Sequence, residues 1–506
     1  MNNAQTTTIF PSRAAYLSGP PQPLALTCPL PTADPYRLYC RIARVGEASF
    51  LLESGAPTTS AARYSFFGSS PSHVLRGRSG HASLIDADRR ICAVTTSLAA
   101  LSSLLSQPTL SPTEDLPPFI GGAVGYLGYD LIRQYEPLPN QAVNDLNLPD
   151  LLVGFFDLVA AIDHHRQRLH LIFAPSWDRF AGEDREKLFT EGLTRLETFH
   201  AHMLGQAAMG PEGPSEEWVR RAIGRAIPGQ SGDEYIERVE RCQEYIRAGD
   251  IYQANLSHRF HFALESSAGL SFQHQNVART IYERLRLINP SPFSALLSFD
   301  DLTLVSCSPE RLVRVHGQTV ETRPIAGTRP RSAAPAQDER LRKELLASAK
   351  EQAEHIMLVD LERNDLGRIC RYGSVRVNEF MTVEDYSHVR HLVSNVMGLL
   401  RSDVPRLEII KSVFPGGTVT GVPKIRCMQI IEELEPVRRG PYTGSLGYFS
   451  RTGSIDLNII IRTMVLTGHS AYLQVGAGIV ADSDPAREYQ ETLDKAQAFF
   501  TTLHGS

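Results

Sequence analysis

The strand patterns of this chain follow one another at hairpin spacing, and this feature constrains its fold most. Short apolar or alternating runs bounded by glycine and proline predict strands at 48–53, 151–156, 169–173, 251–262, 294–299, 302–307, 312–315, 445–450, 455–466 and 471–480. Helical periodicity predicts helices at about 337–362, 405–414 and 424–435, and a terminal helix from Pro485. Strands joined by short connections pair antiparallel, so we predict an α+β fold with large antiparallel sheets and flanking helices.

A polar stretch rich in glycine and proline at residues 205–230 divides the 506-residue chain. After it, Ser231 and Asp233 precede apolar residues at helical spacing, and Ala248-Gly249 supplies a stop, so we predict a helix between them. We expect four parts: an N-terminal extension at 1–34, an N-terminal region at 35–204, a linker at 205–230 and a second region at 231–503.

The charge balance and the cysteines exclude several classes of protein. With 51 Lys and Arg against 56 Asp and Glu, the net charge is −5, which argues against nucleic-acid binding. No apolar run reaches the roughly 18 residues of a membrane span, and the N-terminus lacks the pattern of a secretory signal. The seven cysteines contain no Cys-x-x-Cys, which is typical of reduced thiols. We expect a cytoplasmic protein without a membrane or nucleic-acid partner.

Two glutamate pairs at helical spacing are the first candidates for chemistry. Glu351 and Glu354 lie on one predicted helix, and Glu488 and Glu491 lie on the terminal one. Residues three apart share a helix face, and Mg²⁺ takes one or two protein carboxylates while water and an anionic substrate complete its coordination. A glutamate pair on a helix is more often part of a solvent-exposed face than a metal site. The other motifs of the chain are therefore needed to choose between these two interpretations.

Three further motifs are candidates for anion binding or proton transfer. Gly416-Gly-Thr-Val-Thr-Gly421 precedes a helix and can aim backbone N–H groups at a carboxylate, although its spacing is not that of a P-loop. Arg462 lies in an apolar run, so it must face solvent or meet a carboxylate inside the protein. His391 is either a proton donor or a core histidine. The sequence offers no Ser-His-Asp, Cys-His or zinc-spaced pattern.

A series of motifs resembles the chorismate-utilising enzymes, which include the large subunits of anthranilate synthase and aminodeoxychorismate synthase. The motifs are Ile251-Tyr-Gln-Ala-Asn-Leu-Ser257, Ser308-Pro-Glu-Arg311, Pro324-Ile-Ala-Gly-Thr328, 351–368, 417–424, 438–442, 455–463 and 476–480. The resemblance implies a sandwich of two large antiparallel sheets with helices outside, in which 231–503 is the catalytic region. It also implies chorismate as the substrate and Mg²⁺, bound at the ring carboxylate, as the cofactor.

The resemblance further implies roles for single residues. The metal positions fall on Glu354 and Glu491, with Glu351 and Glu488 as supporting carboxylates. The positions that contact the substrate carboxylates fall on Arg462, Tyr442, Gly421, Gly478 and Lys495. Thr328 and His391 flank the ring, where His391 is placed to act as a general acid when the 4-hydroxyl leaves.

The choice of nucleophile follows from one position. Relatives that add water carry a lysine base where this chain has Gln253. Glutamine cannot deprotonate water, so the resemblance favours an enzyme that uses ammonia. Ammonia needs a supply, and the chain has no glutaminase nucleophile segment, which implies a separate glutaminase subunit as partner.

Between the two ammonia users the features conflict. Asn255, the segment 289–296, Arg311, Thr420-Gly-Val-Pro-Lys424 and Asp456-Leu-Asn458 resemble the aminodeoxychorismate type, whereas Ala326 matches anthranilate synthase. We expect aminodeoxychorismate synthase component I, which makes 4-amino-4-deoxychorismate for folate synthesis. The alternatives are anthranilate synthase component I, which also releases pyruvate, and a non-catalytic relative that binds chorismate or tryptophan. Leu51-Leu-Glu-Ser54 resembles a tryptophan-binding element and makes Leu52, Glu53, Ser54 and Pro292 a possible tryptophan site.

Overall fold

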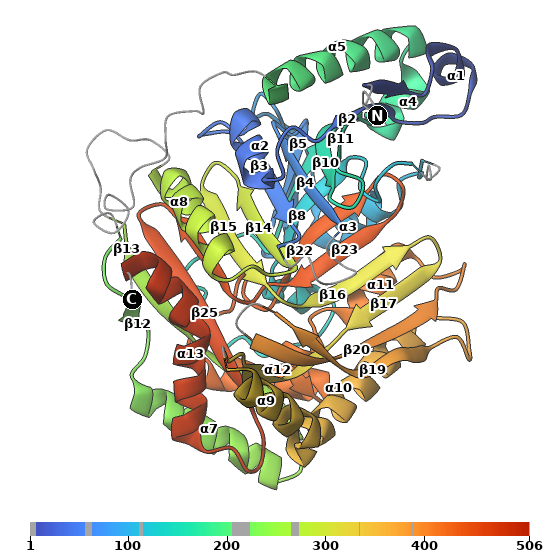
Figure 1. Ribbon diagram of the computed structural model, residues 1–506. Helices are drawn as coiled ribbons and strands as arrows, with labels where there is room; N and C mark the ends of the chain where they lie inside the picture. The colour runs from blue at the N-terminus through green and yellow to red at the C-terminus, as the bar shows by residue number, and fades with distance from the viewer. Residues whose placement is uncertain are drawn as a thin grey trace.

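Two large sheets form the body of the protein in the computed structural model, with helices around them (Figure 1). The structure describes residues 7–55, 63–110, 115–204, 223–264, 273–332, 334–386 and 389–504. Each ladder between the named strands of these residues is antiparallel, and buried side chains of both sheets meet in one core. The predicted fold class is therefore confirmed.

The first sheet has 13 strands. In spatial order they are β1 (Thr8–Phe10), β2 (Leu24–Pro29), β11 (Arg168–Phe173), β10 (Leu158–Asp163), β4 (Tyr64–Ser69), β3 (Ser49–Glu53), β14 (Phe293–Ser298), β15 (Leu302–Ser308), β24 (Thr463–Thr467), β25 (Ser470–Ile479), β13 (Gln253–Ala263) and β12 (Ile227–Pro228), with β21 (Gly421–Val422) paired to β13.

The second sheet has 12 strands. They are β18 (Ile325–Pro330), β20 (Val389–Leu399), β17 (Thr319–Arg323), β16 (Arg311–His316), β23 (Ile455–Ile459), β22 (Ser445–Ser450), β8 (Gly122–Leu127), β9 (Leu151–Phe156), β5 (His73–Arg78), β6 (His81–Asp86) and β7 (Ile91–Thr96), with β19 (Arg376–Asp385) paired to β20.

Helices cover the outer faces and the ends of the sheets (Figure 1). They are α1 (Arg13–Ser18), α2 (Pro35–Ile42), α3 (Ser97–Leu105), α4 (Trp177–Gly182), α5 (Arg185–Leu204), α7 (Gly232–Arg247), α8 (Gln273–Ile288), α9 (Pro335–Ala347), α10 (Ala349–Gly367), α11 (Arg406–Val413), α12 (Lys424–Leu434) and α13 (Pro485–His504), with 3-10 turns η1 (Tyr129–Gln134) and η2 (Gly417–Val419). None of the helices in the described ranges is long and apolar enough to cross a membrane.

The predicted start of α7 is confirmed by its cap. The Ser231 hydroxyl accepts a hydrogen bond from the Glu234 N–H, and the Glu234 carboxylate accepts one from the Ser231 N–H, which forms a capping box. Both sheets contain strands from before and after the predicted linker, of which 205–222 lies outside the described residues. The division into parts stays a prediction.

Two predicted elements were wrong in extent. The helix expected at 337–362 is two helices, because Ser348 has extended backbone and its hydroxyl caps α10 by accepting from the Glu351 N–H. The strand expected at 455–466 is β23 and β24, which belong to different sheets. Between them the chain turns at Arg462, whose φ of 49° lies in the left-handed region. This crossing brings Arg462 to the space between the sheets.

Candidate active site

The two glutamate pairs come together at the N-terminal turns of α10 and α13. Burial raises the pKa of Glu354 to about 7, with further upward effects from Glu351, Asp482 and Glu488 against the downward effect of Lys350. Burial also raises the pKa of Glu488, and Glu491 adds to the rise. Lys350 joins the two helix starts, since its Nζ lies 3.4 Å from Asp482 and 4.0 Å from Glu354. Carboxylates that repel one another in this way favour a bound cation.

These glutamates fit a magnesium ion that is completed by substrate. Within the described residues, no group of three or more His, Cys, Asp or Glu side chains is placed to hold a metal by itself. Mg²⁺ uses only one or two protein carboxylates when water and an anionic substrate fill its other positions. Glu354 and Glu491 would supply one carboxylate from each helix. Glu351 is partly engaged, because Arg329 donates to it at 3.0 Å.

His391 and Thr328 form a pair across two strands. They lie opposite each other in the β18–β20 ladder, and 2.9 Å separates Thr328 Oγ1 from His391 Nδ1. Ala326 lies on the same ladder opposite Leu392 and is also buried. Burial, together with Arg462, lowers the pKa of His391 to about 3. The imidazole is therefore neutral at physiological pH in the free protein and can act as a hydrogen-bond donor.

Arg462 is a partly buried cation at the crossing between the sheets. Its backbone carbonyl accepts from the Cys307 N–H at 3.1 Å, which fixes the turn. Burial lowers the pKa of its guanidinium, and Cys307 and Glu310 partly oppose this effect. In the described part of the chain, no carboxylate lies within 4.0 Å of this guanidinium. A partly buried guanidinium without such a partner is suited to a carboxylate supplied by a ligand.

Glu310 is a site residue that the sequence analysis missed. It lies between β15 and β16, and burial raises its pKa to about 7, against the downward effects of a hydrogen bond from Thr418 and of the charges of Arg462 and Lys495. A carboxyl group with a pKa near neutrality, beside two cations in a buried space, is a good candidate for a proton donor. Glu310 is part of the motif Ser308-Pro-Glu-Arg311, which the sequence analysis compared with known families. Only Arg311 of this motif was interpreted there, and no role was predicted for the glutamate.

The remaining predicted substrate-binding residues gather around β13 and β25. Gly421 has φ +135°, and a Cβ there would lie 2.1 Å from the Gln253 carbonyl oxygen, so only glycine fits. A Cβ on Gly478 would lie 2.6 Å from the Gln253 Nε2. Lys495 Nζ donates to the Gly476 carbonyl at 2.9 Å and lies 2.7 Å from Glu491. The structure thus brings Gln253, Gly421, Gly478 and Lys495 into one neighbourhood.

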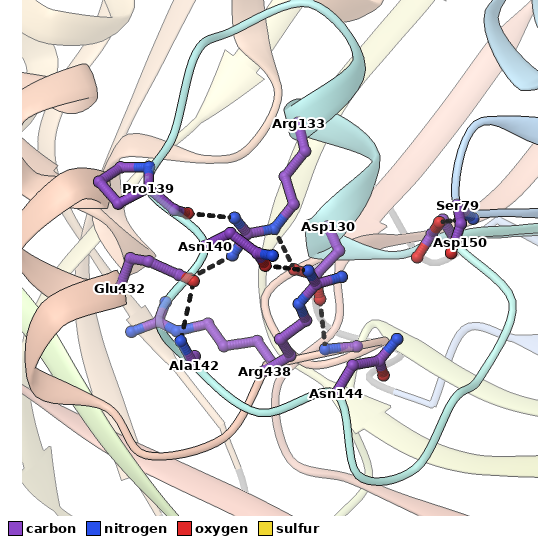
Figure 2. Close-up of polar contacts among 12 residues, drawn as sticks. Ser79, Asp130, Arg133, Pro139, Asn140, Ala142, Asn144, Asp150, Glu432 and Arg438 are labelled. Atoms are coloured by element: carbon purple, nitrogen blue, oxygen red, sulfur yellow. Dashed lines mark hydrogen bonds and ion pairs between the residues drawn. The ribbon is translucent and has the colours of Figure 1, made fainter.

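Tyr442 is held by the segment that precedes it. The Arg439 guanidinium lies over the Tyr442 ring at 5.6 Å and forms a buried ion pair with Glu435 at 2.7 Å. Figure 2 shows how the same segment is fixed to the loop after η1. Asp130 accepts from the Gly440 N–H at 3.0 Å and from Arg133 at 2.8 Å.

Glu432 completes this support and allows a stability prediction. Its carboxylate accepts from the N–H groups of Gln141 and Ala142 at 2.8 and 3.0 Å and pairs with Arg133. Glu432→Ala would leave a buried guanidinium without this partner and two N–H groups without an acceptor. Since Arg133 keeps its ion pair with Asp130, we expect a loss of about 2–4 kcal/mol in the free energy of unfolding, mainly from the two N–H groups, measured by urea denaturation.

The neighbouring Glu433→Ala is the matched control. Glu433 pairs with Arg241 at 3.0 Å and accepts from the Tyr245 hydroxyl at 2.7 Å in a partly exposed position, where such contacts are worth about 1 kcal/mol each or less. Equal losses in the two variants would contradict a special structural role for Glu432.

The possible tryptophan residues line a separate cavity. Leu52, Glu53, Ser54 and Pro292 share the wall of a space of about 630 Å³ between the sheets. The Glu53 carboxylate accepts from Tyr282 at 2.9 Å and from Arg286, so it also anchors α8. Arg311, Asp456 and Asn458, three residues that favoured the aminodeoxychorismate type, line this same cavity. Because these three residues line this cavity, they affect what binds in it more directly than which product the enzyme makes. Tryptophan binding in the cavity stays a prediction.

The comparisons with known proteins agree with this geometry. The profile of the chorismate binding enzyme family matches residues 47–501. Aminodeoxychorismate synthase component 1 of Bacillus subtilis is 41% identical over 463 residues, which cover 92% of this chain and 93% of that protein. Anthranilate synthase component 1 of Thermus thermophilus is 44% identical over 471 residues, which cover 93% of this chain and 95% of that protein.

A solved structure supports the same assignment. Anthranilate synthase component I from Streptococcus pneumoniae superimposes with a TM-score of 0.73 at 32% identity and covers 87% of this chain and 93% of its own. The chain therefore belongs to the chorismate binding enzyme family and is a chorismate-utilising enzyme of the anthranilate synthase and aminodeoxychorismate synthase group.

Proposed function

We propose that this protein is aminodeoxychorismate synthase component I, which replaces the 4-hydroxyl of chorismate by an amino group. The observation that carries the amination is Gln253, a buried amide at the position where, by resemblance, relatives that add water carry a lysine base. An amide cannot take a proton from water, but its oxygen can accept an N–H group of ammonia. In the overall reaction ammonia loses one proton, a C–N bond replaces a C–O bond, and the hydroxyl leaves as water.

Chorismate is a dianion, and the cations of the site would offset its charge. Arg462 and the Tyr442 hydroxyl would bind the pyruvyl carboxylate, and backbone N–H groups near Gly421 would assist at the ring carboxylate. Glu310 would donate a proton to the leaving hydroxyl, since its pKa of about 7 keeps a large fraction protonated. His391, neutral and held by Thr328, would donate a hydrogen bond at the ring.

Magnesium is part of this proposal. When bound at Glu354 and Glu491, it would neutralise the ring carboxylate and withdraw electron density from the diene. Glu351 and Glu488 would keep the local potential negative, which favours the cation. The raised pKa values of Glu354 and Glu488 support this role.

The raised pKa of Glu354 gives a prediction that needs no turnover. Its pKa is about 7 in the folded protein against an ordinary value of 4.5. Because the folded-state pKa is the higher one, protonation stabilises the fold: this contribution is full below about pH 4.5 and is lost as the pH rises through about 7. Added Mg²⁺ should therefore raise the Tm more at about pH 8 than at about pH 5.5, measured by thermal unfolding.

Glu354→Gln provides the control for this measurement, because a neutral amide has no titration to relieve. It should show a small Mg²⁺ effect at both pH values. An equal Mg²⁺ effect on the wild-type Tm at both pH values would contradict the metal assignment.

Anthranilate synthase component I is the second candidate, and Ala326 favours it. By resemblance, aminodeoxychorismate synthases carry at this position a lysine that attacks the ring, and the Ala326 methyl cannot do so. Asn255, which lies beside Tyr442 and Gly476, supports the first candidate from within the site. A separate glutaminase subunit is the proposed source of ammonia in both cases, and we place the reaction in the cytoplasm.

Product analysis decides between the candidates. The chain is incubated with chorismate, Mg²⁺ and ammonium at mildly alkaline pH, while anthranilate fluorescence and pyruvate are followed. We expect no anthranilate, and p-aminobenzoate once aminodeoxychorismate lyase is added. Anthranilate with equimolar pyruvate would establish the second candidate. Chorismate or tryptophan binding without any product would identify a non-catalytic relative.

A further inference from the structure

The Arg439 side chain is buried where three segments of the substrate site meet, and the residue is only 3% exposed. Its Nε and Nη2 donate to the two carboxylate oxygens of Glu435 at 2.9 and 2.7 Å. Its other N–H groups donate to the Asn255 carbonyl at 2.6 Å, the Val419 carbonyl at 2.9 Å and the Thr443 hydroxyl at 3.2 Å. A guanidinium has five N–H donors, so each of them has an acceptor here.

The three uncharged acceptors belong to segments that carry predicted substrate contacts. Val419 is the last residue of η2 and lies two positions before Gly421. Asn255 lies on β13. Thr443 directly follows Tyr442, and its hydroxyl donates to the Tyr442 carbonyl at 2.6 Å. One guanidinium thus fixes the Gly421 turn, β13 and the Tyr442 segment relative to one another.

The Tyr442 ring contacts the same guanidinium. Arg439 lies over the rings of Tyr442 at 5.6 Å and Tyr129 at 5.0 Å, and such cation–π contacts favour one placement of an aromatic ring. At the other end of the Tyr442 side chain, a Cβ on Gly476 would lie 2.7 Å from both the Tyr442 hydroxyl oxygen and the Asn255 Oδ1. The position of this hydroxyl relative to β13 therefore depends on where Arg439 holds the ring and the strand.

Glu435 fixes the guanidinium in turn. Its Oε1 accepts from both the N–H group and the hydroxyl of Ser257, each at 2.8 Å, and the carboxylate pairs with Arg439 at 2.7 Å. A lysine could keep the charge of this pair, but its ammonium is a compact point charge and cannot reach all the acceptors that the planar guanidinium spans. The arrangement therefore depends on the shape of the arginine and not only on its charge.

These contacts assign Arg439 a part in substrate binding. Resting on the proposed function, in which the Tyr442 hydroxyl binds the pyruvyl carboxylate, we propose that Arg439 is a positioning residue for chorismate. It places the Tyr442 hydroxyl against β13 and the Gly421 turn before the substrate arrives. Such preorganisation strengthens binding, because fewer groups have to be ordered when the ligand binds. Arg439 does not contact the substrate itself, since each of its N–H groups already has an acceptor.

Arg439→Lys tests this role through the Kd for chorismate, measured by calorimetry with Mg²⁺ and without ammonium. The variant keeps the charge beside Glu435 and loses the planar set of donors. We expect the Kd to rise by about tenfold, the effect of about one hydrogen bond. In the assay with ammonium, the KM for chorismate should rise equally while kcat changes less than about twofold, because the lost contact acts on binding.

Arg451→Lys is the matched control for this variant. Arg451 is a largely buried arginine that pairs with Asp157 at 2.6 Å and donates to the Ala174 carbonyl at 2.7 Å, away from the site. The same substitution there should lower the Tm and leave the Kd for chorismate unchanged.

A double variant tests whether the effect passes through the Tyr442 hydroxyl. Tyr442→Phe alone should raise the Kd for chorismate by about tenfold, because it removes the hydroxyl. In that background Arg439→Lys should add less than about threefold, since no hydroxyl is left to position. A full tenfold addition would overturn the proposal, and so would an unchanged Kd in Tyr442→Phe.

Thr443 offers a milder test that does not change the buried ion pair. Thr443→Val keeps the branched side chain and removes the hydroxyl that links Arg439 to the Tyr442 carbonyl, whereas Thr443→Ser keeps this hydroxyl. We expect the Kd for chorismate to rise by about threefold in Thr443→Val and to stay unchanged in Thr443→Ser.

The outcomes separate this proposal from the proposed function. A lowered Tm with an unchanged Kd for chorismate, in either Arg439→Lys or Thr443→Val, would show a purely structural role and overturn the positioning role. A wild-type chain that binds chorismate but forms no aminated product would overturn the proposed function instead. The series of Kd values would then still decide the role of Arg439, because it needs no turnover.

Discussion

Glu491→Gln is expected to abolish magnesium-dependent turnover, with a loss of about a hundredfold or more in kcat/KM. The substitution keeps the size of the side chain and removes the charge that would face the cation. Glu491 lies on the first turns of α13 beside Glu488, which in turn raises the pKa of Glu354 on α10, so α13 would lose its proposed metal ligand. The measurement is the rate of chorismate consumption as a function of the Mg²⁺ concentration.

Two controls distinguish the loss of a metal ligand from a general effect of removing a charge. Glu240→Gln removes the charge of an exposed glutamate on α7 and should change neither the rate nor its magnesium dependence. The Mg²⁺-induced rise in Tm should also disappear in Glu491→Gln. Because Glu491 is paired with Lys495, a loss of rate with an intact Mg²⁺ effect on the Tm would assign Glu491 to the positioning of that lysine instead.

Arg462→Leu should raise the KM for chorismate by about a hundredfold or more, the effect of losing a bidentate charged contact. The same substitution should not lower the Tm, because burial already disfavours this cation and no carboxylate in the described residues pairs with it. The pKa of His391 should rise, since Arg462 contributes to its depression. Initial rates, thermal unfolding and an NMR titration of His391 measure the three effects.

Arg451→Leu is the contrasting variant. Arg451 is also buried, but its guanidinium pairs with Asp157 at 2.6 Å and donates to the Ala174 carbonyl at 2.7 Å, away from the site. It should lower the Tm and leave the KM for chorismate unchanged. If Arg462→Leu behaved in the same way, Arg462 would be a structural residue and not a substrate contact.

The fold class was predictable because short apolar runs separated by glycine and proline turns indicate antiparallel hairpins. The helix ends with strong chemical signals were also predictable, such as Ser231 at the start of α7. The break at Ser348 was not, since serine is tolerated inside a helix and only its tertiary surroundings decide for a cap. The apolar run at 455–466 hid a change of sheet, because both halves are buried and the hydropathy does not fall between them.

The site was predictable only in part for a similar reason. Charged motifs such as the glutamate pairs stand out in a sequence, and the structure places both near each other. The pKa values of Glu310 and His391 depend on burial between segments far apart in the chain, which no local pattern records. Arg311 and Asp456, whose sequence motifs favoured one product, line a different cavity, the one that also contains Glu53 and Pro292.

The pairing of early with late strands has a consequence for biosynthesis. β8 pairs with β22, and β3 pairs with β14, so neither sheet can be completed by the first half of the chain. At about 5–20 residues per second, translation of the chain takes roughly 25–100 s, and β22 emerges only near its end. During most of this time the edges of β3 and β8 lack their partners, and such edges invite aggregation. Yield on overexpression should therefore depend on chaperone supply and temperature more than on the stability of the finished fold.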